Sequence, residues 1–102
     1  MNLSKILLQD LTKLISNNEE LFKDFRHIFL FGSIIKEKLY PHDIDVLLVY
    51  SIYSNIIAYK AKTISNYLEK EMKIPVDLTV LSQNELESTG FLNRIKVYYE
   101  LK

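Results

Sequence analysis

The sequence predicts an α/β (α+β) protein with a small mixed three-stranded sheet and flanking helices. Apolar residues with helical spacing alternate with short runs of strand-forming residues, and 48% of the 102 residues are apolar. No repeat, low-complexity tract or linker divides the chain, so we expect residues 1–102 to form a single domain. The 13 basic residues balance the 13 acidic ones, which disfavours a nucleic-acid partner, and the absence of cysteine excludes thiolate metal sites.

The N-terminal part is expected to be helical. Leucines recur at helical spacing from Leu3 to Leu14, and Asn17-Asn18 ends this helix. Ser16 followed by Glu19 has capping-box spacing and predicts a second helix over about 19–26. A strand over 28–31 then runs into a tight turn.

The remaining elements alternate between strand and helix. A short helical or irregular piece over 34–39 is separated from the next strand by a proline. Residues 44–50 are almost continuously apolar, which indicates a central strand covered on both faces. A helix over 54–73, a strand over 76–81 and a short acidic turn that ends at Gly90 come next. The segment 91–102 fits either a helix or an edge strand.

No element is long and apolar enough to suggest a membrane protein. The longest aliphatic and aromatic run covers 46–50, whereas a membrane helix needs about 20 residues. The short apolar stretch near the start lies between Lys5 and Asp10 and does not resemble a signal peptide. We therefore expect a cytoplasmic protein with no membrane contact.

Two aspartates open the central strand. Asp43 and Asp45 are two positions apart, and alternate strand side chains point to the same face, whereas Ile44 points to the other. Adjacent carboxylates repel each other unless a cation lies between them. A hard divalent ion such as Mg²⁺ takes such oxygen ligands together with substrate phosphates.

Two further features are expected at the same end of the sheet. Asp77 opens the strand that follows the long helix, and a strand–helix–strand crossover places the starting ends of parallel strands side by side. If the preceding strand is antiparallel, its end at Gly32-Ser33 also meets this edge. Glycine lets a phosphate approach the backbone, and Ser33 can donate its N–H and its hydroxyl.

The combined pattern resembles the nucleotidyltransferase superfamily that includes DNA polymerase beta. The family pattern is a hydrophobic strand followed by Gly-Ser, then Asp-hydrophobic-Asp opening the next strand, and a later third carboxylate. Here nine residues separate Gly32-Ser33 from Asp43-Ile44-Asp45, and Val76-Asp77-Leu78 lies further along the chain. The resemblance covers about 28–81, with 91–95 as an extension, and implies a polymerase-beta-like fold similar to minimal nucleotidyltransferases of bacteria and archaea.

The resemblance implies transfer of a nucleoside monophosphate, AMP from ATP, to an acceptor hydroxyl. Asp43 and Asp45 would hold two Mg²⁺ ions, and Asp77 would join the catalytic metal and favour the deprotonated acceptor. Gly32 and Ser33 would hold the triphosphate.

A basic residue is also implied near the Gly-Ser pair. Many minimal members carry an arginine there, and Ile35-Lys36-Glu37 stands in its place. Lys36 or Lys38 would therefore supply positive charge to the nucleotide, as a point charge without a bidentate fork. His42 is either a turn residue or a phosphate contact.

The resemblance also implies a partner. Minimal family members are often paired with a small helical HEPN protein in toxin–antitoxin systems, so the chain would be the antitoxin that adenylylates a tyrosine of a HEPN toxin. The acceptor site would come from that partner or from a second copy of the chain. Two alternatives stay open: a non-catalytic antitoxin or binding module that acts by contact, and nucleotidyl transfer to a small molecule or RNA.

Overall fold

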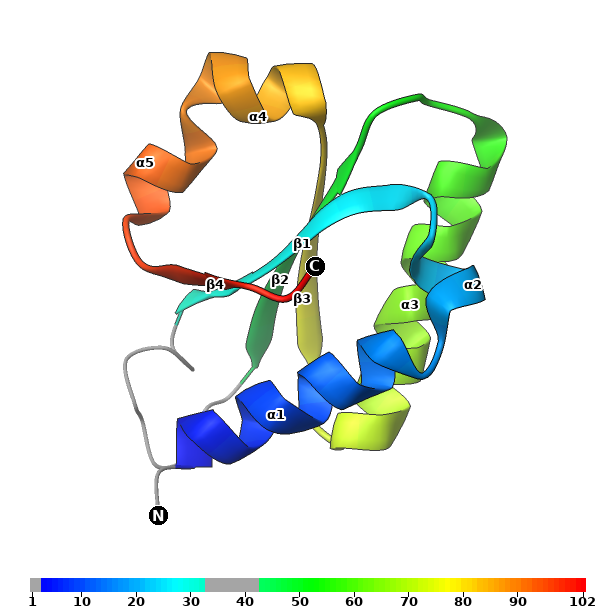
Figure 1. The fold of residues 1–102 in the computed structure, drawn as a ribbon, viewed down its shortest axis with the longest axis vertical. Helices are drawn as coiled ribbons and strands as arrows, with labels where there is room; N and C mark the ends of the chain where they lie inside the picture. Colours follow the sequence, from blue (N-terminus) through cyan, green and yellow to red (C-terminus); the bar gives the residue numbers. More distant parts are fainter. Residues whose placement is uncertain (1–2, 33–42) are drawn as a thin grey trace.

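The computed structural model describes residues 3–32 and 43–102, which form a sheet between two groups of helices (Figure 1). The first half contains helices α1 (Leu3–Ser16) and α2 (Glu19–Phe22) and strands β1 (Phe25–Phe31) and β2 (Ile44–Tyr50). The second half contains helix α3 (Asn55–Met72), strand β3 (Val76–Ser82), helices α4 (Gln83–Thr89) and α5 (Phe91–Ile95), and strand β4 (Tyr98–Glu100). The mixed α/β class is confirmed.

The described strands form a four-stranded mixed sheet in the order β3-β2-β1-β4. As predicted, β2 runs parallel to β3. It runs antiparallel to β1, which is the condition under which Gly32 was expected to meet the starting ends of β2 and β3. The predicted count of three strands is one short, because β4 pairs antiparallel with the outer edge of β1. An edge strand was one of the two expectations for 91–102, and all three residues of β4 are exposed, as an edge position allows.

Two apolar clusters confirm that β2 is covered on both faces. Ile44, Val46 and Leu48 belong to the larger cluster, which includes residues of α1, α2 and α3. Leu47 and Val49 belong to the smaller one, which Leu86 of α4 closes and against which α5 packs. Because α4 begins where β3 ends, this helix lies over the ends of β2 and β3 and not over their starts.

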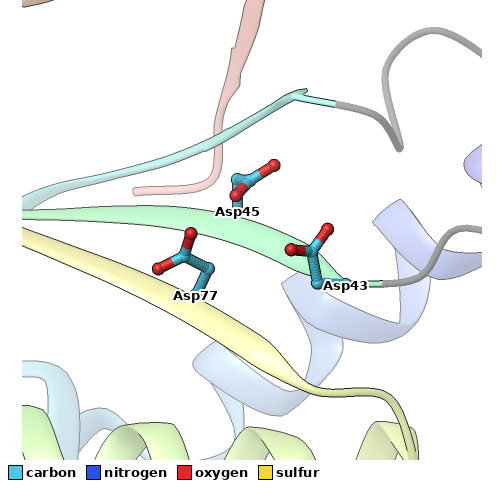
Figure 2. A group of neighbouring side chains, drawn as sticks. All are labelled: Asp43, Asp45 and Asp77. Atoms are coloured by element: carbon cyan, nitrogen blue, oxygen red, sulfur yellow. The ribbon is translucent and has the colours of Figure 1, made fainter.

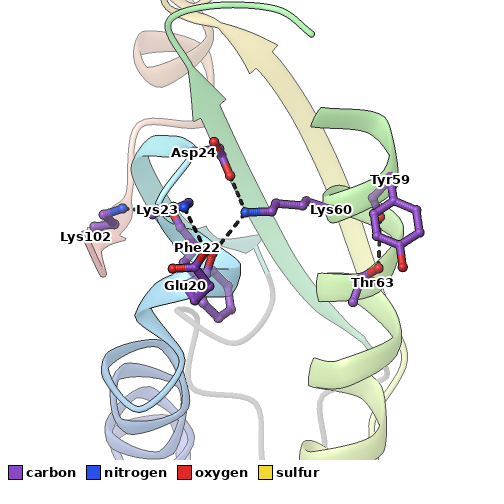
Figure 3. A network of polar contacts seen from close by, with 8 residues as sticks. All are labelled: Glu20, Phe22, Lys23, Asp24, Tyr59, Lys60, Thr63 and Lys102. Carbon is purple, nitrogen blue, oxygen red and sulfur yellow. Dashed lines mark hydrogen bonds and ion pairs between the residues drawn. The ribbon is translucent and has the colours of Figure 1, made fainter. Parts of the chain in front are cut away.

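The predicted second helix is too long. It was expected over 19–26, but α2 ends at Phe22 and β1 begins at Phe25. Lys60 of α3 donates to the main-chain carbonyl of Glu20 at 3.0 Å and pairs with Asp24 (Figure 3). The carbonyl groups of a helix end need donors, and these come from a distant part of the chain.

A second lysine also donates to a main-chain carbonyl at the end of α2. Lys102 donates to the carbonyl oxygen of Phe22 at 2.9 Å (Figure 3). Nothing local distinguishes a helix that ends at Phe22 from one that continues, since Phe22 and Phe25 are both buried in the same cluster. Tertiary contacts therefore decide where α2 ends.

The segment 91–102 contains both of the elements considered for it, α5 and then β4. The main chain beyond β4 stays on the sheet, since the N–H of Leu101 donates to the carbonyl of Ile28 at 2.7 Å. The short piece expected over 34–39 lies outside the described residues. Within the described ranges, no helix combines the length and the apolar character needed to cross a bilayer.

Candidate metal and nucleotide site

The structure brings Asp43, Asp45 and Asp77 together at one end of the sheet. Asp45 and Asp77 are register partners on the parallel strands β2 and β3, and Asp43 immediately precedes β2. One carboxylate oxygen of each residue lies within 4.8 Å of the others, and all three side chains project from the same side of the two strands (Figure 2). The predicted proximity is confirmed, and the role of these residues as ligands stays a prediction.

The alternation of side chains along β2 explains why a ligand can reach these carboxylates. Ile44 and Val46 point into the core, so Asp45 points to the face that carries α4 and α5. Helix α4 covers that face where β3 ends, and α5 packs on Phe31 of β1 beside Asp45, so the starting ends of β2 and β3 are left to the carboxylates. Asp43 and Asp45 are consequently half-buried and Asp77 is exposed.

The donor set fits a hard divalent cation. All three groups offer carboxylate oxygens, which Mg²⁺ and Mn²⁺ bind in preference to nitrogen or sulfur ligands. Three negative charges at this separation repel one another, and a bound cation would compensate them. The cluster can therefore hold a divalent ion and, through it, the phosphates of a nucleotide.

Gly32 lies directly against this cluster. It follows the last residue of β1 with φ +84°, and Phe31 before it is the register partner of Asp45. A Cβ built on Gly32 would lie 2.7 Å from Cγ of Asp45. We expected Gly32 to admit a phosphate and did not predict this contact, although the antiparallel pairing of β1 with β2 would have indicated it. Ser33, Lys36, Lys38 and His42 lie outside the described residues.

Aromatic residues continue the same row across the sheet. Phe31 pairs with Asp45 on one side and with Tyr98 on the other. The ring of Phe31 meets that of Phe91 edge to face at 5.5 Å, and the guanidinium of Arg94 lies over Phe91, 5.8 Å from its centroid. Helix α5 thus places an arginine on the carboxylate-bearing side of the sheet, which spacing in the sequence alone did not identify.

The four-stranded mixed sheet with flanking helices is a nucleotidyltransferase fold. The family model described as "Nucleotidyltransferase domain" matches residues 11–101, so the chain belongs to this family. No curated protein sequence matches the chain.

Several solved structures share the fold. A chain from the complex of the tri-AMPylated Shewanella oneidensis HEPN toxin with the MNT antitoxin is 17% identical, with a TM-score of 0.61 over 98% of this chain and 72% of the other. A Sulfolobus solfataricus protein assigned to the nucleotidyltransferases is 18% identical, with a TM-score of 0.57 over 95% and 80%. A mutant of the toxin–antitoxin pair MntA–HepT, in which two aspartates separated by one residue are replaced by glutamate, is 16% identical, with a TM-score of 0.62 over 88% and 70%.

Proposed function

We propose that this chain moves a nucleoside monophosphate, AMP from ATP, to a hydroxyl group of a protein partner. The observation that carries the proposal is the convergence of three carboxylates within 4.8 Å at the starting ends of β2 and β3, in a chain of the nucleotidyltransferase family. Members of this family generally use a nucleoside triphosphate and a divalent metal.

Different residues are assigned to the metal ions and to the triphosphate. Asp43 and Asp45 are assigned to hold two Mg²⁺ ions, with Asp77 as a further ligand, and Gly32, Ser33 and Lys36 are assigned to the triphosphate. Bound Mg²⁺ supplies Lewis-acid stabilisation of the charge on the phosphates.

Asp77 is assigned to the acceptor side of the reaction. It is the exposed member of the cluster and lies on the edge strand β3, where an acceptor can approach it from solvent. Asp77 holds the acceptor hydroxyl and takes up its proton as the oxygen bonds to the α-phosphorus. The bond from that phosphorus to the β-phosphate oxygen breaks, and pyrophosphate leaves.

The proposed partner is a HEPN-type toxin. In support, one structure of similar fold contains an AMPylated HEPN toxin with its MNT antitoxin, and another carries two altered aspartates at the same spacing as Asp43 and Asp45. The chain also has apolar side chains available for a protein contact: Ile52, Tyr53, Ile56 and Tyr59 are between 45% and 81% exposed.

The same exposed apolar residues favour one other function, a binding module that neutralises its partner by contact alone. The two functions differ in their need for Asp77, because a contact-only protein has no use for a proton acceptor in the carboxylate cluster. Transfer to a small molecule is a third outcome, which the identity of the labelled acceptor would reveal.

The test is incubation with labelled ATP, Mg²⁺ and the protein encoded beside this chain, followed by mass measurement of that protein. We expect the wild-type chain and Asp10→Asn, which alters an exposed carboxylate of α1, to add adenylyl groups to the partner. Asp77→Asn should keep most of the Mg·ATP affinity and lose transfer, because it removes an interaction made chiefly in the transition state.

The protective effect in cells separates the enzyme from the binding module. If transfer is the function, Asp77→Asn abolishes both the modification of the partner and protection of the cell. Full protection by a folded Asp77→Asn variant would contradict catalysis and establish neutralisation by contact.

A further inference from the structure

The close approach of Gly32 to Asp45 constrains the geometry of the site. A Cβ on Gly32 would lie 2.7 Å from Cγ of Asp45 and 3.1 Å from its Cβ, and it would overlap Oδ2. Non-bonded carbon atoms pack at about 3.5–4.0 Å. The carboxylate of Asp45 therefore occupies the space that any side chain at position 32 would need.

The positive φ of Gly32, +84°, already disfavours a side chain, but it is not the only reason for a glycine at this position. Lys73 and Lys96 carry side chains at φ 59° and 65°, so this fold accepts non-glycine residues in the left-handed region. Gly90 has φ 63° as well, and a Cβ built on it would meet nothing within 4 Å. The neighbouring carboxylate is what distinguishes Gly32 from Gly90.

We propose that Gly32 is a positioning residue for Asp45. Its missing side chain leaves the room in which the Asp45 carboxylate sits within reach of Asp43 and Asp77. The pairing of Phe31 with Asp45 holds the end of β1 against the start of β2, so the main chain at Gly32 forms one wall of this space.

A methyl group at position 32 would fill that space. Asp45 would then turn into another staggered rotamer, and its carboxylate would leave the cluster. Gly32 thus acts through Asp45, a task separate from admitting a phosphate to the main chain. The inference rests on the proposed function only in treating the cluster as a cation site.

The first test uses Mn²⁺ alone as the probe, titrated calorimetrically into the wild type, Gly32→Ala and Gly90→Ala. Both substitutions place a methyl group at a positive φ, but only the first meets a carboxylate. We expect Gly32→Ala to lose Mn²⁺ affinity by about tenfold or more and Gly90→Ala to stay within about twofold of the wild type. Equal losses in the two variants, or none in Gly32→Ala, would overturn the proposal.

The second test is a crystal structure of Gly32→Ala without added metal. We expect the Asp45 carboxylate to be displaced, with Asp43 and Asp77 unmoved, and an unchanged Asp45 would overturn the proposal. If the wild type fails to bind Mn²⁺, the proposed cation site is refuted, whereas this structure still decides what Gly32 does.

A double variant covers the case in which Gly32→Ala does not fold. Removing the Asp45 carboxylate also removes the overlap, so Gly32→Ala/Asp45→Ala should then fold. Failure of the double variant to fold would show that the damage does not arise from Asp45, and the proposal would be wrong.

Discussion

At the scale of single residues, the three carboxylates of the cluster lie close together, and their negative charges repel one another. Three acidic groups that share a space within 4.8 Å raise the free energy of the folded chain, since each charge repels the other two. Asp24 shows the opposite case, because the hydrogen bond and the charge of Lys60 lower its pKa below the usual value. The lysine beside Asp24 thus favours its charged form, whereas the charges within the cluster disfavour one another.

The first prediction concerns Asp45→Asn. Because the substitution removes one of three mutually repelling charges and keeps the shape of the side chain, we expect the free energy of unfolding to stay unchanged or to rise, by up to roughly 2 kcal/mol. Nucleotidyl transfer should be lost in the same variant. Urea denaturation and the transfer assay measure the two effects.

Asp24→Asn is the matched comparison, since it removes a carboxylate that has a lysine partner. It should lower the free energy of unfolding and leave transfer intact. A large loss of stability in Asp45→Asn instead would assign Asp45 a structural role.

At the scale of the elements, the start of α4 decides how much of the sheet face is covered. The N–H of Ser82 donates to Oε1 of Glu85 at 2.9 Å, and the N–H of Glu85 donates to Oγ of Ser82 at 3.0 Å, which is a complete capping box. This box starts α4 immediately after β3 and brings Leu86 over Leu47 and Val49. The carboxylates lie on the same face, at the other end of the strands.

The second prediction is a pH dependence of this cap. The hydrogen bond from the Ser82 N–H, followed by that from its hydroxyl, lowers the pKa of Glu85 below its usual 4.5. A lowered pKa in the folded state adds stability that is present above pH 4.5 and is lost as the pH falls through the lowered value. We expect Glu85→Gln to unfold more easily than the wild type at pH 7, and the difference to shrink steadily below pH 4.5.

Ser82→Ala serves as the control for this pH series. It removes the hydroxyl that accepts from the Glu85 N–H and should cost about 1 kcal/mol through the lost cap. Part of this cost should remain in acid, because that hydrogen bond does not depend on the charge of Glu85. Urea denaturation at several pH values measures both variants. A Glu85→Gln difference that does not change with pH would contradict the capping role of the charged carboxylate.

At the scale of the whole molecule, the site exists only in the assembled sheet. Asp45 and Asp77 come from strands separated by the whole of α3, and Gly32 comes from the end of a third strand. An unfolded chain holds these groups apart, so a cation bound by the cluster binds the folded state alone. Metal binding and folding should therefore be coupled.

The third prediction rests on that coupling. At a Mg²⁺ concentration about 100 times its dissociation constant, ligand linkage adds about 2.7 kcal/mol to the free energy of unfolding. For a chain of this size, the melting temperature should rise by roughly 10–20 °C. Thermal unfolding in MgCl₂ and in NaCl of equal ionic strength measures the effect. Equal shifts in the two salts, or the same Mg²⁺ shift in Asp45→Asn, would refute the cation site.

The arrangement of the carboxylate cluster could be predicted from the sequence. Side-chain alternation places Asp43 and Asp45 on one face of β2, and a strand–helix–strand crossover brings the start of β3, with Asp77, beside them. Both rules depend on the order and periodicity of neighbouring residues, which the sequence displays directly. From the sequence, the direction of β1 was only a condition, and the structure pairs β1 antiparallel with β2.

Three other features were decided by tertiary contacts: the end of α2 at Phe22, the pairing of β4 with β1, and the fit of the Asp45 carboxylate against Gly32. Each depends on groups far apart in the chain. Lys60 and Lys102 satisfy the carbonyls at the end of α2, and β4 has no buried residues to mark it as a strand. Residue periodicity does not reveal such contacts, because they depend on packing between segments that lie far apart in the sequence.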